Sequence, residues 1–140
     1  MKFTIKPKSG IDLMHFGMDR DHVRRAFGGE FESFLRTEDS EIPCDYFPHS
    51  GVFAYYKFPD VLEALEFAKP AEVYFEHANL VGAHVLNVKK LMDNFDQCLE
   101  MDSSGIISHE LGIAIFAPGW DEDGLQVVES VFVFEDGYYS

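Results

Sequence analysis

The stretch GVFAYYKFPDVLEALEFA, residues 51–68, carries the strongest indication of the fold. Its two halves, Gly51–Phe58 and Leu62–Ala68, are short runs rich in aromatic and aliphatic residues, and Pro59-Asp60 between them is a turn signal. Strands joined by a short connection pair in antiparallel fashion. We therefore predict a β-hairpin here.

Similar runs occur on the C-terminal side of this hairpin. The same pattern predicts strands at Glu72–Glu76, Glu110–Ala117 and Val127–Glu135. GIAIFA (residues 112–117) resembles GVFAYY (residues 51–56), and VVESVFVF (residues 127–134) resembles VLEALEFA (residues 61–68). The later pair of strands therefore resembles a second copy of the first hairpin.

A helix is expected before each pair of strands. Apolar residues recur with helical spacing over Val88–Leu99, and Asn87 stands in the N-cap position. An earlier, shorter helix is predicted over Asp19–Phe27, with Asp19 as its N-cap and Gly28 at its end. The polar segment Glu30–Pro43 has little periodicity and is expected to form a loop.

These patterns predict a single α+β domain over residues 1–140, with an antiparallel sheet and helices on one face. A duplicated helix–hairpin unit, covering about residues 11–80 and 81–140, explains the two similar halves. The expected core includes residues of the second helix and of the last two strands, namely Leu91, Met92, Phe95, Ile113, Ile115, Val131 and Val133.

Length and composition indicate a chain that folds alone. It has 140 residues, of which 46% are hydrophobic, and such a chain can offset the entropy cost of folding. The N-terminal residues lack the apolar run of a signal peptide, which predicts a cytoplasmic location. No segment approaches the roughly 18 apolar residues of a membrane-spanning helix, so no membrane association is expected.

The charge distribution is one-sided. The net charge is −14, and residues 91–140 contain 11 acidic residues and no Lys or Arg. Such a field repels nucleic acids and anionic lipids and attracts a cationic protein. The alternative is an acidic surface that only keeps the chain soluble.

No motif for catalysis or for a cofactor was found. The six histidines lack the spacing of a metal-binding pair, and the two cysteines form no CxxC motif. Asp121-Glu122-Asp123-Gly124 does not continue as a calcium-binding loop, because Ser130 occupies the place of the bidentate acid. We expect no metal, no cofactor and no enzyme activity.

A partner-binding site is predicted in the connection Pro118–Gly124, which reads as an exposed hairpin loop. Trp is enriched at the centres of protein interfaces, and here it precedes three acids. The predicted contact residues are those of the loop together with acids of the second helix and the residues after it: Trp120, Asp121, Glu122, Asp123, Asp93, Asp96 and Glu100.

The segment FGMDRDHVRRAFG (Phe16–Gly28) resembles the start of a helix in proteins of the β-lactamase inhibitor protein and outer-membrane assembly lipoprotein type. This resemblance implies helix and antiparallel-strand units that act by binding other proteins. The small, acidic, aromatic-rich composition is also similar to that of bacterial immunity proteins, which neutralise basic toxin domains.

The preferred hypothesis is a non-enzymatic, acidic protein-binding module, an inhibitor or immunity-type protein with a basic partner. The alternatives are a small intracellular ligand-binding protein or an enzyme with an aromatic pocket, and a self-associating structural protein. The sequence leaves the partner and the oligomeric state open.

Overall fold

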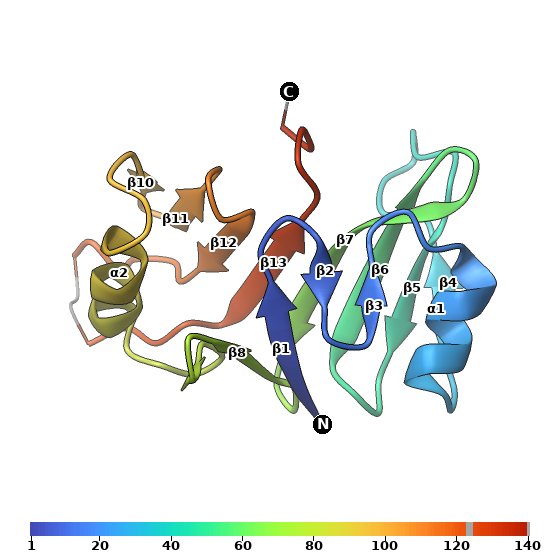
Figure 1. Cartoon of the computed structure of the whole chain (residues 1–140), viewed down its shortest axis with the longest axis horizontal. Helices are drawn as coiled ribbons and strands as arrows, with labels where there is room; N and C mark the ends of the chain where they lie inside the picture. Colours follow the sequence, from blue (N-terminus) through green and yellow to red (C-terminus); the bar gives the residue numbers. More distant parts are fainter. Residues whose placement is uncertain (123–124, 140) are drawn as a thin grey trace.

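Two β-sheets and two short helices make up the computed structural model, which describes residues 1–122 and 125–139. The helices, α1 (Arg20–Phe27) and α2 (Val85–Asp93), lie at opposite ends of the molecule with strands between them (Figure 1). The strands are β1 (Lys2–Lys6), β2 (Gly10–Ile11), β3 (Met14–His15), β4 (Glu32–Phe34), β5 (Cys44–Phe47), β6 (Val52–Lys57), β7 (Val61–Ala68), β8 (Glu72–Phe75), β9 (Ala78–Asn79), β10 (Glu100–Asp102), β11 (Gly105–Ser108), β12 (Ile113–Phe116) and β13 (Ser130–Phe134).

The large sheet has eight strands in the order β10-β11-β12-β13-β7-β6-β5-β4, each antiparallel to its neighbours. The predicted hairpin is confirmed, since β6 and β7 pair across residues 58–60. Along the chain, α1 precedes β4 to β7 and α2 precedes β10 to β13, and the two halves join where β7 pairs with β13. The order of elements is thus the same in both halves, while their origin by duplication stays a prediction.

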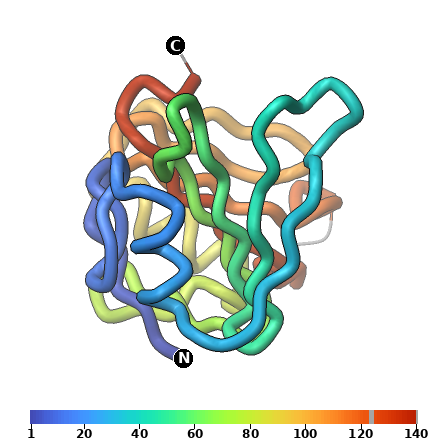
Figure 2. Tube along the Cα trace, turned by 90° about the vertical axis from the view of Figure 1, so that its right-hand side faces the viewer, coloured from blue at the N-terminus to red at the C-terminus, as the bar shows by residue number. Residues whose placement is uncertain are grey.

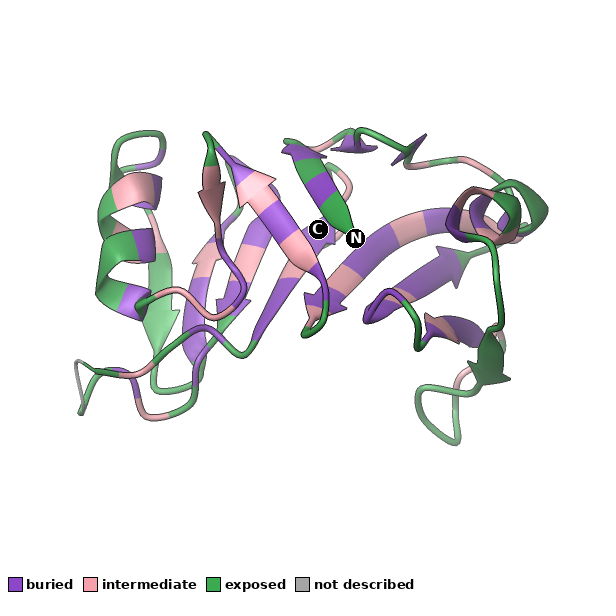
Figure 3. Cartoon of the chain, turned by 90° about the horizontal axis from the view of Figure 1, so that it is seen from below, coloured by how far each residue is buried: buried purple, intermediate pink, exposed green. Residues whose placement is uncertain are grey.

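The small sheet has the order β3-β2-β1-β8-β9. Its centre is a parallel pair, β1 with β8, which joins segments far apart in the sequence. Buried and exposed residues alternate along β1 (Figure 3). Phe3 and Ile5 are the buried ones and face inward.

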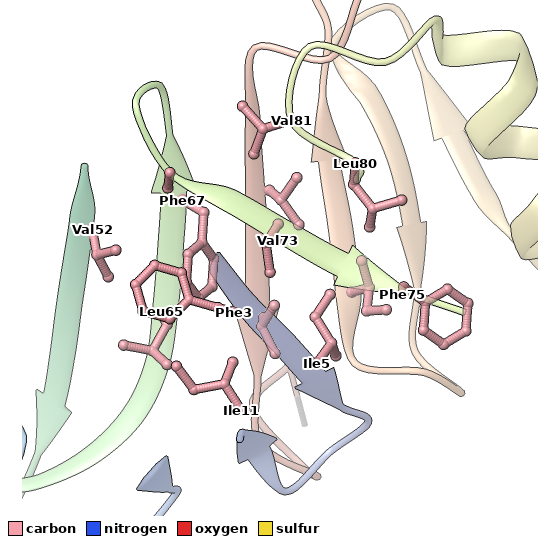
Figure 4. Packing of buried hydrophobic residues seen from close by; sticks show 14 of the residues in the cluster. Phe3, Ile5, Ile11, Val52, Leu65, Phe67, Val73, Phe75, Leu80 and Val81 are labelled. Atoms are coloured by element: carbon pink, nitrogen blue, oxygen red, sulfur yellow. The ribbon is translucent and has the colours of Figure 1, made fainter. Parts of the chain in front are cut away.

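The core lies between the two sheets. Figure 4 shows Phe3 and Val73 of the small sheet pointing toward Leu65 and Phe67 of the large sheet. All four side chains are fully buried, and each contributes about 1.5 to 3 kcal/mol to folding. We call the side of the large sheet that packs on this core its inner face, and the opposite side its outer face.

The predicted α+β fold, with helices on one face of an antiparallel sheet, is wrong. The two helices have only eight and nine residues, and the protein is mostly β. A second sheet packs on the large sheet, in the place that the prediction gave to helices. The pattern of β1 is only five residues long and its partner β8 is distant in sequence, so local periodicity did not reveal this sheet.

The earlier helix prediction is confirmed. Asp19 caps α1, its carboxylate accepting a hydrogen bond from the backbone N–H of His22 at 2.8 Å, and Gly28 ends the helix with a φ of 66°. The expected loop Glu30–Pro43 is interrupted by β4, which pairs with β5. The remainder of this segment projects beyond the sheet (Figure 2).

The later helix is displaced from its prediction. Helix α2 begins at Val85 with His84 as N-cap, rather than at Val88 with Asn87 as N-cap, and it ends at Asp93 rather than at Leu99. Of the predicted core residues, Met92, Ile113, Ile115, Val131 and Val133 are buried and Leu91 is partly buried. Phe95 lies beyond the helix and is 44% exposed, so its assignment to the core is wrong.

Candidate functional site

The outer face carries a row of side chains that crosses all eight strands. Because side chains alternate along a strand, residues paired across the sheet share a face, and the pairing register therefore identifies the row. From one edge to the other it reads Glu32, Tyr46, Phe53, Glu66, Phe132, Ala114, Ile107 and Glu100. Carboxylates stand at both edges and at the centre, and aromatic rings lie in between.

The aromatic rings of this face are in contact with one another. Tyr46 stacks on Phe53 with ring centroids 4.4 Å apart. Tyr55 lies two residues after Phe53 on the same face of β6, and its ring centroid is 5.8 Å from that of Phe132. After β13 the chain folds back, and the ring of Tyr138 lies 5.4 Å from that of Phe132. Such contacts are worth about 0.5 to 1.5 kcal/mol each beyond the area that they bury. The middle of the outer face is therefore an ordered aromatic cluster in which Tyr55 and Phe134 are buried, whereas Phe116 at the pocket is 45% exposed.

A pocket of about 240 Å³ opens on the half of this face formed by β10 to β13. It exists because small residues, Gly105, Ala114 and Ser130, lie among the larger side chains of Phe116 and Phe132. Gly105 allows no larger residue, since a Cβ atom there would clash with the carbonyl oxygen of Ile115. The hollow is thus built into the sheet.

Two carboxylates line the pocket, and each has one oxygen held by the chain. Glu66 Oε1 accepts a hydrogen bond from the Tyr55 hydroxyl at 2.7 Å. Asp102 Oδ1 accepts from the backbone N–H groups of Ser104 and Gly105 at 2.8 and 3.1 Å. Among residues 1–122 and 125–139, nothing donates to Glu66 Oε2 or Asp102 Oδ2. Both carboxylates are oriented, and each keeps one oxygen for a ligand.

Arg36 lies at the rim of the pocket, in the segment that follows β4. Its guanidinium carbon is 4.3 Å from the ring centroid of Tyr55 and 5.9 Å from that of Phe132. One guanidinium nitrogen donates to the Tyr138 hydroxyl at 3.3 Å, and no described carboxylate forms an ion pair with it. Arg36 is the one cationic side chain among the described residues lining this pocket.

Burial and the hydrogen bond to Glu66 raise the pKa of Tyr55 above its ordinary value. Tyr55 therefore stays protonated and keeps donating to Glu66 throughout the physiological pH range. The orientation of this carboxylate is insensitive to pH there.

The structure places the predicted contact residues in different environments. Trp120 is only 9% exposed, and its indole N–H donates to the carbonyl of Asp102 at 2.7 Å. Asp96 is also buried, accepting from the Ser108 hydroxyl and the Cys98 N–H. Neither side chain is available at the surface. The loop around Trp120, which was predicted to be exposed, is therefore held by a buried side chain. Trp120 instead fixes the turn whose Asp102 lines the pocket.

The other predicted contact residues do not form one cluster. Asp93 is exposed and pairs with Lys89 at 2.9 Å, and Glu100 is exposed beside His109 at 3.0 Å. Asp121 and Glu122 are exposed, whereas Asp123 lies outside the described residues. Of the whole set, only Glu100 belongs to the row on the outer face.

The outer face and its pocket were not predicted, although the sequence carries a signal for them. In VFAYY and SVFVF the residues that alternate with the core positions are Phe53, Tyr55, Phe132 and Phe134. A strand with only one buried face usually has polar residues at those positions. Aromatic residues at these outward positions of β6 and β13 therefore indicate a second apolar face.

The most highly connected charged cluster lies elsewhere, around Asp45 on the inner face. Every buried polar side-chain atom in the described part of the chain has a hydrogen-bond partner, which is typical of a structural network. Within residues 1–122 and 125–139, no group of His, Cys, Asp and Glu could hold a metal ion. The outer face is thus the best-supported candidate site.

Comparisons with protein-family models, with curated proteins and with solved structures find no match to this chain. The resemblance of residues 16–28 to the inhibitor and lipoprotein helix stays a prediction. No helix among the described residues is both long enough and apolar enough to cross a membrane.

Proposed function

We propose that this chain is a non-enzymatic module that binds a basic protein through the outer face of its large sheet. The observation that carries the proposal is the aromatic surface with Glu32, Glu66, Glu100 and Asp102 around it and a pocket within it. A cytoplasmic inhibitor of the immunity type, which neutralises a basic toxin domain, is the form of this function that the composition favours.

Charge and surface chemistry support a basic partner. The net charge of −14 steers cationic proteins toward the chain over distances longer than a hydrogen bond. At close range, aromatic faces attract Lys and Arg side chains, with about 0.5 to 2 kcal/mol for each well-placed pair. Long-range attraction and short-range contacts thus favour the same kind of partner.

The size of this pocket argues against a small-ligand site or an enzyme active site at this place on the outer face. Sites for small molecules usually enclose about 300 to 1,000 Å³, and this pocket has only about 240 Å³. That volume suits one side chain of a partner better than a complete ligand. The exposed acids of the C-terminal part, Asp93, Asp121 and Glu122, then add to the attracting field without forming the contact centre.

The test compares two double variants with the same change in charge. Glu66→Gln with Asp102→Asn removes the two pocket carboxylates, and Asp21→Asn with Glu30→Gln removes two exposed acids in and after α1. Proteins captured from a lysate of the source organism by the immobilised chain are identified, and the purified partner is titrated by calorimetry against each variant. We expect a basic partner whose dissociation constant rises about ten-fold or more with the pocket variant alone.

Three results would contradict the proposal. These are a captured partner that is acidic or neutral, equal weakening by both double variants, and the absence of any specific partner.

A further inference from the structure

We infer that the pocket on the outer face accepts an arginine side chain of the partner. This inference rests on the proposed function and deepens it, because it specifies which residue of a basic protein is recognised. It follows from the charge of the pocket, from its walls and from the way in which Arg36 is already held beside it.

The charged side chains that line the pocket have a net charge of −1. Glu66 and Asp102 contribute two carboxylates, whereas Arg36 contributes one cation. A single incoming cation balances the pocket, and an incoming carboxylate would leave two uncompensated negative charges. Glu66 is partly buried whereas Asp102 is exposed, so the burial cost applies to Glu66 and favours a cationic side chain beside it.

The walls fit the two parts of an arginine side chain. Ile107 and Ala114 form an apolar floor for its methylene groups, and Phe116 and Phe132 offer ring surfaces for its planar head. Glu66 belongs to β7 and Asp102 to β10, with three strands between them. A guanidinium, which has five N–H donors in a fixed plane, can therefore donate to the free oxygen of one of these two carboxylates at a time. A lysine ammonium carries the same charge but cannot stack on a ring or donate in this forked geometry.

Arg36 shows that this surface already holds a guanidinium. The chain's own arginine lies over Tyr55, 4.3 Å from its ring centroid, without a carboxylate partner among the described residues. A partner's arginine would find ring surfaces of the same kind at Phe116 and Phe132, together with the carboxylates of Glu66 and Asp102. Arg36 itself repels a second cation and so limits the affinity of the pocket.

The experiment is an NMR titration of the full-length, isotope-labelled chain with four capped pentapeptides, identical except for a central Arg, Lys, Gln or Glu. We expect the Arg peptide to shift the backbone amide signals of Gly105, Ala114 and Phe132 at concentrations up to about 10 mM, which covers millimolar dissociation constants. The Lys peptide should bind about ten-fold more weakly, and the Gln and Glu peptides should leave these signals unchanged.

Four variants test which side chains of the pocket bind the Arg peptide, and a fifth is the control. Glu66→Gln and Asp102→Asn should each weaken binding of the Arg peptide several-fold, and Ala114→Leu should abolish it by filling the floor while the spectrum remains that of a folded chain. Arg36→Gln should instead strengthen binding several-fold, because it removes the competing cation. Asp21→Asn, away from the pocket, is the control and should have no effect.

Several outcomes would overturn the inference: no signal shift with the Arg peptide, equal affinity for the Arg and Lys peptides, or weaker binding after Arg36→Gln. If these occur while a basic partner still depends on Glu66 and Asp102, the arginine pocket is wrong and the proposed function stands. If no basic partner depends on the outer face, the proposed function itself fails.

Discussion

At the scale of single residues, Asp45 on β5 links more elements than any other described carboxylate. It is fully buried and accepts hydrogen bonds from Arg20 and Arg24 of α1, from Ser33 of β4 and from Tyr56 of β6. These bonds range from 2.6 to 3.1 Å. Through this one side chain, α1 is attached to the edge of the large sheet.

Replacing Asp45 with Asn should lower the free energy of unfolding at pH 7 by about 3 to 5 kcal/mol, because Arg24 loses its carboxylate partner and the buried Arg20 keeps only the half-exposed Asp60. The effect should depend on pH. Burial raises the pKa of Asp45, but the hydrogen bonds from Arg24, Ser33 and Tyr56 outweigh it and hold the pKa below its usual 3.8. A carboxyl group whose pKa is lowered by folding stabilises the folded chain at pH values above 3.8. This contribution is lost as the pH falls below 3.8 and through the lowered pKa.

Urea unfolding of the wild-type chain and the Asp45→Asn variant at pH 7 and pH 3 measures this contribution. The difference between the two proteins should be smaller at pH 3. A difference that is the same at both values would mean that the charge of Asp45 is unimportant.

At the scale of elements, the end of α2 depends on contacts outside the helix. The apolar pattern continues to Leu99, yet the helix stops at Asp93. Asp96 turns inward instead and binds the hydroxyl of Ser108 on β11 at 2.7 Å. The buried hydrogen bond to Ser108 fixes the backbone at Asp96 outside the helix. The helical spacing of apolar residues from Phe95 to Leu99 therefore does not correspond to a helix.

Two alanine variants test this assignment of α2. Met92 is fully buried, so Met92→Ala should cost about 2 to 5 kcal/mol of stability. Phe95 is 44% exposed and has an edge-on contact with Phe75 at 5.2 Å, so Phe95→Ala should cost only about 1 kcal/mol. Chemical denaturation of both variants gives the comparison, and equal losses would place Phe95 in the core after all.

At the scale of the whole molecule, charge dominates the physical behaviour. The net charge of −14 arises from 25 acidic and 11 basic residues. Mutual repulsion of the exposed acids opposes the compact state, and it is screened over about 8 Å at physiological ionic strength. Residues 91–140 contain 11 acids and no Lys or Arg, so the repulsion acts mostly on the C-terminal part of the chain.

Added salt should therefore stabilise the chain. We expect the melting temperature at pH 7 to rise by several degrees between about 0.01 and 0.15 M NaCl. The same series near pH 4.6, where the net charge vanishes, is the control and should be nearly flat. A melting temperature at pH 7 that falls with salt would show that attractive ion pairs outweigh the repulsion.

The local part of the fold could be predicted because its causes are local. The turn at Pro59-Asp60 identified the β6–β7 hairpin, and the cap at Asp19 identified the start of α1. The alternation of apolar residues in β12 and β13 correctly assigned Ile113, Ile115, Val131 and Val133 to the core. The acidic character of the surface also follows from composition alone.

Only the tertiary structure decided the second sheet and the site. The pairing of β1 with β8 and of β7 with β13 joins residues far apart in sequence, and no local pattern encodes which strands will meet. The pocket depends on that pairing, because Glu66 becomes a neighbour of Phe132 only where the two halves of the chain meet. Local sequence determines how each strand is shaped, whereas a site assembled across strands arises from the free energy of burying them together.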